Sequence, residues 1–204
     1  MFRRSPNSIK VRIALAYKGL EYEAEEMMAA DRAPMLEAAG WPLTPVLVDG
    51  DVAMRDSTAI LHYLEANYRE PSLTPATRDE IRSAERIVTV LAPQIAHIRG
   101  GLDAEIPKPE GERDPAAAER ARAAIVAATE RLEERFSSRE WLVGERMSMY
   151  DVILASDLVP TRAPAEFVAQ SPLWRYLDAN LRIEKERPRV AEWVGRVVAY
   201  DGLA

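Results

Sequence analysis

Cysteine is absent from this chain of 204 residues. That absence excludes disulfides, thiolate metal sites and a cysteine nucleophile, and it agrees with the reducing cytoplasm in which we expect the protein. Long apolar runs are missing as well, since no stretch approaches the roughly 18 residues that indicate a membrane span. No apolar signal-peptide core follows the N-terminal arginines. The sequence therefore predicts a cytoplasmic protein that does not enter membranes.

A surplus of basic residues is also lacking. Lys and Arg number 27 against 33 Asp and Glu, for a formal net charge of −6, whereas a nucleic-acid binder needs a basic face to replace phosphate counterions. The only two histidines, His62 and His97, lie in predicted helices without the spaced ligand set of a metal site, so we interpret both as structural and predict no metal. Hydrophobic residues make 48% and charged residues 29%, which is typical of a globular protein.

The most informative stretch spans residues 43–64 and reads LTPVLVDGDVAMRDSTAILHYL. A β-type run covers residues 46–48, and the pair Asp49-Gly50 predicts a hairpin turn because it tolerates the positive φ of a tight loop. We expect a second strand over residues 52–54 to pair antiparallel with the first. Apolar residues then recur at helical spacing from residue 58, so the hairpin leads directly into a helix.

Asp56 and Ser57 stand where that helix begins. A helix N-terminus has unpaired N–H groups and a partial positive charge, so with a hydroxyl beside it the position suits a carboxylate ligand. The simpler interpretation is that Ser57 or Asp56 only caps the helix, as such residues do in very many proteins.

The combination of Thr-Pro, hairpin and acidic-Ser helix start resembles the glutathione-binding half of the glutathione S-transferases, whose N-terminal domain is thioredoxin-like. The resemblance implies that Pro45 is cis and that the backbone of Thr44 pairs with the cysteinyl part of glutathione, the expected co-substrate. It also implies that Asp56 attracts the amine of the γ-glutamyl group and that the N–H groups near Ser57 hold its carboxylate. A peptide that pairs with an exposed backbone edge needs the chain turned outward there.

The beginning of the chain fits the same family. Ser5 at the N-cap and Pro6 at the first helical position begin a helix that Gly19 ends, and the alternating residues 20–26 predict a strand. The sequence SPNSIKVRIALAYKGLEY, residues 5–22, resembles the first helix and second strand of serine-type transferases, closest to the zeta and theta classes.

This resemblance implies that Ser5 is the catalytic residue. In serine-type transferases a serine at this helix start hydrogen-bonds the glutathione sulfur, and Asn7 and Ser8 are the alternatives in this sequence. A hydroxyl donor and the positive end of a helix dipole both stabilise the reactive thiolate. A plain N-cap is the other interpretation of Ser5, and the two roles do not exclude each other. Without cysteine, the mixed-disulfide chemistry of cysteine-type relatives is not available.

The glycine end of the glutathione site is the least defined part of the assignment. We expect a short helix over residues 35–38 that ends at Gly40. In the family this segment usually supplies a basic or amide side chain for the glycine carboxylate. Here Trp41 stands near that position, and Arg32 is the nearest cation.

The second half of the chain predicts helices only. After a proline-bearing linker over residues 71–77, one helix is expected to kink at Pro93 and to end at Gly100-Gly101, and a mobile loop follows over residues 106–114. Ser148 and Asp151 form a capping box that opens a buried helix, and this motif resembles the core helix of the transferase C-terminal domain. The other expected helices cover residues 125–136, 173–181 and 189–200.

The predicted fold is therefore α/β followed by all-α: a thioredoxin-like glutathione-binding domain over residues 1–70, the linker, and an all-helical transferase domain over residues 78–204. We expect the first strand of the thioredoxin-like domain to be truncated. Only four residues precede Ser5, and at about 3.3 Å each they reach roughly 13 Å. Residues 20–26 then lack a partner. We hypothesise that the natural protein has apolar residues upstream, or that this chain is a weakened version of the fold.

Two functions agree with these features. The first is a glutathione transferase that activates the thiol at Ser5 for attack on a small hydrophobic electrophile, or for an isomerisation of the zeta kind. The second is a binding or scaffold module without turnover, which the incomplete glycine end favours. The resemblance also implies a homodimer. The acceptor substrate is not defined by the generic apolar sequence of the helices that line its pocket.

Overall fold

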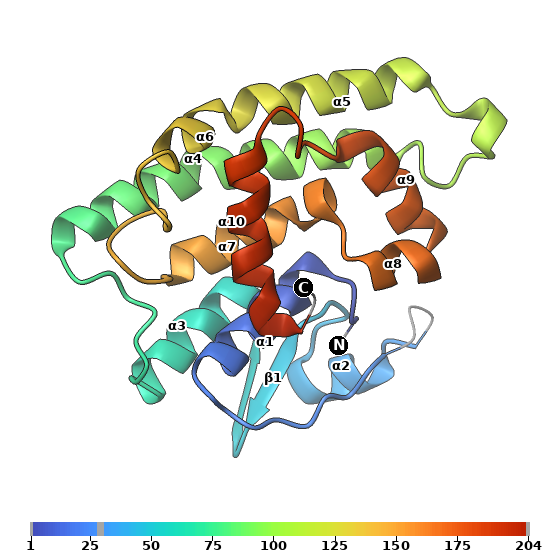
Figure 1. The fold of residues 1–204 in the computed structure, drawn as a ribbon. Helices are drawn as coiled ribbons and strands as arrows, with labels where there is room; N and C mark the ends of the chain where they lie inside the picture. The colour runs from blue at the N-terminus through green and yellow to red at the C-terminus, as the bar shows by residue number, and fades with distance from the viewer. Residues whose placement is uncertain (1, 28–30, 203–204) are drawn as a thin grey trace.

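The computed structural model describes residues 2–27 and 31–202, and Figure 1 shows a smaller part below a larger helical part. In the smaller part the described elements are helices α1 (Pro6–Tyr17), α2 (Ala33–Ala39) and α3 (Ser57–Asn67) and strands β1 (Val46–Asp49) and β2 (Val52–Arg55). The larger part holds α4 (Arg78–Asp103), α5 (Pro115–Ala128), α6 (Glu130–Arg135), α7 (Met149–Leu158), α8 (Ala165–Gln170), α9 (Pro172–Leu181) and α10 (Pro188–Val198). Short 3-10 turns are η1 (Glu110–Glu112), η2 (Val159–Arg162) and η3 (Ala199–Asp201).

The predicted hairpin is confirmed, with a shift of one residue in its loop. Asp49 pairs with Val52, so the loop residues are Gly50 and Asp51, and Gly50 takes the positive φ of 59° that the tight turn requires. The hydroxyls of Tyr68, which follows α3, and of Tyr63 on α3 donate to the Asp49 carboxylate at 2.6 and 3.0 Å, and these hydrogen bonds lower the pKa of Asp49. They fix the hairpin on α3.

The strand predicted over residues 20–26 is wrong. In the described residues the sheet consists of β1 and β2 alone, and residues 20–27 form no strand. A cavity of about 510 Å³ separates this segment from β1, and Leu20, Met27 and Leu47 are among its lining residues. Residues 2–5, ahead of α1, contain no strand either, which agrees with the expectation of a truncated first strand. An alternating sequence becomes a strand only when its backbone finds a partner.

Two helix boundaries in the larger part also differ from the expectation. The glycines do not end α4, because the helix continues through Gly100 and Gly101 to Asp103. Leu102 is fully buried beyond them, and its burial outweighs a glycine cost of about 1 kcal/mol each. The helix expected around residues 125–136 is divided into α5 and α6 at Thr129, whose buried hydroxyl donates to the Ile125 carbonyl at 2.8 Å.

Helix α7 forms the centre of the larger part, between α4 and α10 (Figure 1). The predicted capping box is present, and the fully buried Asp151 accepts hydrogen bonds from Leu142 N, Ser148 N, Ser148 Oγ and Trp193 Nε1 at 2.6–3.0 Å. One carboxylate therefore joins the loop before α7 to α10. Among the described helices, none is both long enough and apolar enough to cross a membrane.

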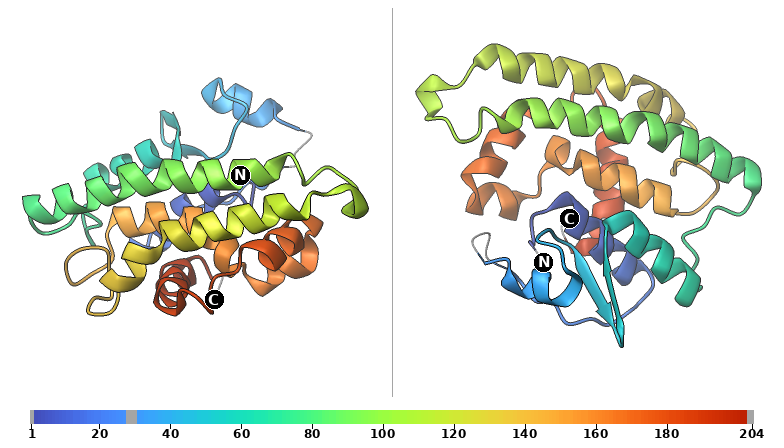
Figure 2. Two further views of the ribbon diagram at one scale, coloured as in Figure 1. Left: turned by 90° about the horizontal axis from the view of Figure 1, so that it is seen from above. Right: turned by 180° about the vertical axis from the view of Figure 1, so that it is seen from behind.

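The two parts share one hydrophobic core rather than two. Helix α1 packs on α3 and on α7, and its buried Ile9 and Ile13 belong to the same cluster as Val152. The chain end returns to α1: Arg12 donates to both carboxylate oxygens of Asp201 at 2.6 Å. Figure 2 shows from above and behind how α1 lies beneath the helical part. The position of α1 therefore depends on both halves of the sequence.

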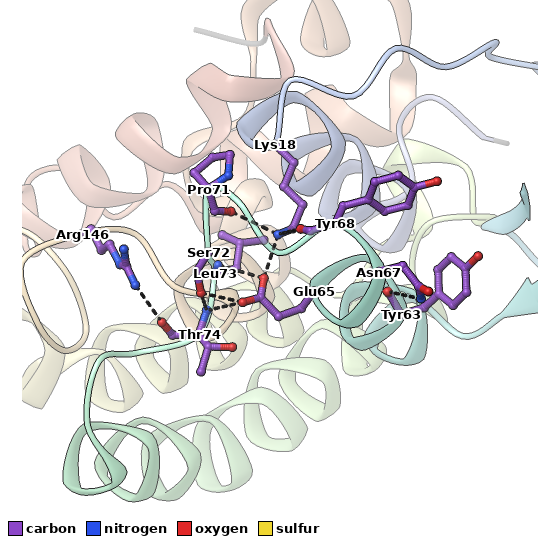
Figure 3. A network of polar contacts seen from close by, with 10 residues as sticks. All are labelled: Lys18, Tyr63, Glu65, Asn67, Tyr68, Pro71, Ser72, Leu73, Thr74 and Arg146. Carbon is purple, nitrogen blue, oxygen red and sulfur yellow. Dashed lines mark hydrogen bonds and ion pairs between the residues drawn. The ribbon is translucent and has the colours of Figure 1, made fainter.

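A buried ion pair fixes the connection between α3 and α4, and Figure 3 shows its network. The side chain of Lys18, at the end of α1, is 0% exposed, and its Nζ donates to Glu65 Oε2 at 2.7 Å and to the carbonyl of Tyr68 at 2.6 Å. Glu65 also accepts from the backbone N–H groups of Leu73 and Thr74. The first residues of the predicted linker are thus held on α1 and α3.

Candidate functional site

Three segments distant in the sequence meet at one end of the sheet: the start of α1, the loop before β1 and the start of α3. The Thr44-Pro45 peptide bond in that loop is cis, as the resemblance implied. Ser8, in the first turns of α1, is 1% exposed, and its Oγ lies 3.4 Å from Thr44 Oγ1. This contact positions the start of α1 beside the backbone of Thr44.

Asn7 makes the second connection between these segments. Its Oδ1 accepts hydrogen bonds from Ser57 Oγ at 3.3 Å and from Lys10 Nζ at 3.4 Å. Because both bonds use the amide oxygen, the amide N–H groups of this exposed side chain remain as donors at the start of α1. Asn7 and Ser8 thus have contacts that Ser5 does not have.

Ser5 occupies the N-cap position of α1, with Pro6 at the first helical position as predicted. Its side chain makes no capping hydrogen bond, so the plain N-cap interpretation lacks the bond that normally defines it. The hydroxyl is partly exposed and lies at the positive end of the helix dipole. Ser5 can therefore donate to an anion at this helix start.

Asp56 is the residue that caps α3. Its Oδ1 accepts from the N–H groups of Thr58 and Ala59 at 2.9 and 2.8 Å, and its φ is 71°, a positive value that is uncommon for residues other than glycine. Two of the N–H groups that we expected to hold a ligand carboxylate are thus occupied by Asp56. Ser57, the first residue of the helix, is buried and keeps its hydroxyl directed at Asn7.

Buried charge lies behind the start of α1. Lys10 is 4% exposed, and α7 presents Asp157 toward it. Burial raises the pKa of Asp157, and the charges of Lys10 and Arg99 act in the opposite direction. A lysine at this depth needs such compensation, because an unpaired buried charge is costly. Lys10 thus donates to Asn7 at the start of α1 and acts through its charge on Asp157 of the core helix.

Neither histidine belongs to the group of polar residues at the start of α1. His97 lines a second cavity, of about 290 Å³, with Arg120 and other residues of α4 and α5, and His62 is exposed on α3. No group of three or more potential ligands that could hold a metal ion occurs in residues 2–27 and 31–202. The polar groups at the α1 start are hydroxyls, an amide and a buried ammonium, which suit an anionic ligand.

Comparison with known proteins identifies the family. A sequence profile of the glutathione S-transferase N-terminal domain matches residues 1–72, and the profile of the glutathione S-transferase C-terminal domain matches residues 115–196. The chain belongs to the glutathione S-transferase family. Its fold is that of the family: a thioredoxin-like N-terminal domain, here with a short two-stranded sheet in the described residues, and a helical C-terminal domain.

Zeta-class transferases and isomerases are among its relatives. Glutathione S-transferase Z1 of Arabidopsis thaliana is 42% identical over 76 residues, which are 35% of this chain and 34% of that protein. A probable maleylacetoacetate isomerase of Vibrio cholerae is 27% identical over 192 residues, 88% of this chain and 87% of that protein. The crystal structure of maleylacetoacetate isomerase from Methylobacterium extorquens AM1, with bound malonate and glutathione, matches with a TM-score of 0.70 at 25% identity, covering 99% of this chain and 92% of that one.

The sequence does not indicate every residue that shapes this candidate site. The structure brings Thr44 and Ser57, two of the predicted binding residues, next to Ser8 and Asn7, but the sequence predicted no structural role for Lys10 or for Asn7 as the partner of Ser57. The spacing of three residues between Asn7 and Lys10 on one helix was the available signal. The contact between Asn7 and Ser57 joins residues that are 50 positions apart, and it has no local signature in the sequence.

Proposed function

We propose that this chain is a glutathione-dependent enzyme that activates the glutathione thiol for attack on a small hydrophobic electrophile. The observation that carries the proposal is the junction of three segments, in which Ser8 contacts Thr44 and Ser57 contacts Asn7. These contacts bring a helix N-terminus, an outward-turned backbone edge and a second helix start to one place. A tripeptide with a thiol and two ends of defined charge fits such an arrangement.

In this proposal the backbone of Thr44, before the cis Pro45, pairs with the cysteinyl unit of glutathione. Ser57 binds the γ-glutamyl carboxylate with its own N–H and with its hydroxyl, whose proton turns from Asn7 Oδ1 to the ligand when glutathione binds. The exposed Asp56 attracts the γ-glutamyl amine with the carboxylate oxygen that does not cap α3. The N–H groups of Thr58 and Ala59 already donate to Asp56, so Ser57 is the principal donor for the γ-glutamyl carboxylate.

Ser5 is the proposed thiol-activating residue. Its hydroxyl has no capping partner, and α1 directs its positive end toward the same position. Both features favour thiolate over thiol, which lowers the pKa of the bound sulfur. Asn7 is the alternative donor, because its exposed side chain keeps both amide N–H groups, while its oxygen accepts from Lys10 and, before glutathione binds, from Ser57.

Isomerisation with glutathione as cofactor is the second candidate reaction. Two of the similar proteins are named as maleylacetoacetate isomerases, which supports a reaction of this kind without defining the substrate of this chain. We further propose that the enzyme is a cytoplasmic homodimer, since an acidic surface is no obstacle to a two-fold interface. The alternative is a scaffold protein that binds glutathione without turnover, and a turnover assay distinguishes it from an enzyme.

The deciding experiment separates binding from chemistry. We expect the protein to be retained on immobilised glutathione and to turn over one member of a panel of small electrophiles and cis-configured dicarboxylic substrates. Ser57→Ala should weaken glutathione binding about tenfold or more, because it removes a hydrogen bond to a charged group. Ser5→Ala should leave binding almost unchanged, raise the pKa of the bound thiol and lower turnover at neutral pH, with recovery at higher pH.

Two results would contradict the proposal. Binding without turnover across the whole panel would favour the scaffold. If Ser5→Ala leaves both the thiolate absorbance of bound glutathione and the turnover unchanged, Ser5 is not the activating residue, and Asn7→Ala is then the variant to measure.

A further inference from the structure

One edge of β1 carries backbone groups without a partner in the described residues. A two-residue hairpin loop is closed by a hydrogen-bonded pair, here Asp49 and Val52, and such pairs alternate with non-hydrogen-bonded pairs along an antiparallel ladder. Val46 and Val48 therefore direct their N–H and C=O groups away from β2. Among residues 2–27 and 31–202, no other backbone group is hydrogen-bonded to these four groups. β1 is thus an edge strand with four groups that can pair with another strand.

The cavity of about 510 Å³ lies beside β1. All four residues of β1 line it, and residues 20–23 belong to the segment that lines its other side. One strand residue occupies about 160 Å³, from a rise of about 3.3 Å, a strand spacing of about 4.8 Å and a sheet spacing of about 10 Å. The cavity therefore has room for about three residues of extended chain. Val11 and Leu15 of α1 and Met35 of α2, all buried, make part of its lining apolar.

Acidic side chains lie on the segment opposite β1. Glu21 and Glu23 line the cavity and are exposed, and neither forms an ion pair within the part of the chain that the structure describes. An unpaired backbone edge, an apolar lining and two carboxylates together suit an extended peptide with apolar residues and a basic residue. A second copy of this chain is a poor donor, because its own alternating segment, residues 20–26, would bring like charges together.

We propose that this cavity binds an extended segment of a partner protein, which adds a strand to β1. The segment pairs with Val46 and Val48 and directs a basic side chain toward Glu21 or Glu23. Main-chain hydrogen bonds supply affinity in this mode of recognition, and the apolar lining and the acids supply the sequence preference. Thr44 lines the same cavity, so the bound segment lies next to the candidate glutathione site. The inference does not depend on the proposed function, because the strand can bind whether or not glutathione does.

The probe is a dye-labelled, amide-capped peptide of seven residues that alternates valine and threonine between two terminal lysines. Fluorescence anisotropy with the full chain should show saturable binding of one peptide per chain, with a dissociation constant on the order of 100 μM or lower. Methylation of the internal backbone nitrogens should weaken binding at least about tenfold, because the peptide then has no N–H to donate to β1. Replacement of the lysines by glutamates should weaken it at least about fivefold, because the cavity lining is acidic.

Two proline variants locate the binding edge. Val48→Pro removes an N–H that faces the cavity and should weaken peptide binding at least about tenfold. Ala53→Pro is the matched control: Ala53 is the register partner of Val48, so its N–H faces the opposite edge of the hairpin, and this variant should bind the peptide as the wild type does.

Charge reversal tests the acidic side without changing the backbone. Glu21→Lys combined with Glu23→Lys should reverse the preference, so that the glutamate-ended peptide binds more tightly than the lysine-ended one. Glu119→Lys combined with Glu130→Lys makes the same change of charge at exposed residues of α5 and α6 and should keep the wild-type preference. These variants decide the question if the proline variants do not fold.

Several results would overturn the inference. These are a wild type without saturable binding, equal binding of the methylated peptide, unchanged binding in a folded Val48→Pro, and an unchanged preference after charge reversal at Glu21 and Glu23. Sedimentation of the wild type with and without the peptide tests the other possible occupant. An assembly that the peptide splits into smaller species would mean that a second copy of the chain fills the cavity, and the assignment to a partner protein would be wrong.

Discussion

Removing the charge of Glu65 should destabilise the protein several times more than the same change at an exposed acid of the smaller part. Glu65 Oε2 accepts from Lys18 and Leu73, and Oε1 accepts from Ser72 and Thr74 (Figure 3). Every neighbour is a donor. In Glu65→Gln the amide N–H2 must face one of these donor pairs, and Lys18, whose side chain is 0% exposed, loses its counter-charge.

The magnitude follows from the pKa of Glu65. Burial alone would raise this pKa, but the hydrogen bonds from Lys18, Ser72, Leu73 and Thr74 outweigh it and lower the pKa from 4.5 to about 2. A change of this size corresponds to about 3 kcal/mol of folding free energy by linkage, and solvent screening of a side chain that is 14% exposed reduces it to about 1–2 kcal/mol. The unpaired Lys18 adds to the loss, so we expect Glu65→Gln to cost about 2–4 kcal/mol at pH 7.

Urea unfolding followed by tryptophan fluorescence, at one fixed protein concentration, measures this cost. Because the folded pKa is the lower one, the contribution of Glu65 is complete above about pH 5 and disappears as the pH falls toward 2. The difference between wild type and Glu65→Gln should therefore shrink at pH 3.5. Glu37→Gln, an exposed change on α2, is the control and should stay within about 0.5 kcal/mol. A loss below about 0.5 kcal/mol in Glu65→Gln, or a difference independent of pH, would refute the reasoning.

Three further results are expected. Asp201→Ala should lower the unfolding free energy by about 3–5 kcal/mol in urea titrations, because it removes the carboxylate that accepts two hydrogen bonds from the nearly buried Arg12. A loss under about 1 kcal/mol would show that this ion pair adds little to stability. Asp151→Asn should lower the melting temperature, because the carboxylate accepts four hydrogen bonds and the amide would place N–H groups against some of these donors. Asp51→Asn, a change at an exposed residue, is the control and should leave the melting temperature unchanged. Sedimentation at micromolar concentration should show a homodimer, and a monomer would contradict the proposed assembly.

Local chemistry in the sequence determined much of the fold. Pro6 after Ser5 fixed the beginning of α1, the Asp49-Gly50 pair located the hairpin to within one residue, and the capping box of Ser148 and Asp151 located α7. Each of these signals acts over a few residues, through a fixed φ, a tolerated positive φ or a side chain that caps the helix next to it. Such effects are present in the sequence before any tertiary contact forms.

Tertiary structure decided the features that need a distant partner. Residues 20–26 alternate as a strand does, yet they are not one, because among the described residues no strand pairs with them across the cavity beside β1. Gly100 and Gly101 remain helical because burial of Leu102 outweighs their intrinsic cost. The candidate site is the clearest case: Asn7 meets Ser57, and Ser8 meets Thr44, only after the hairpin and α3 have packed against α1. Residue types along a chain carry no record of such contacts, since the contacts depend on how the packed elements are oriented.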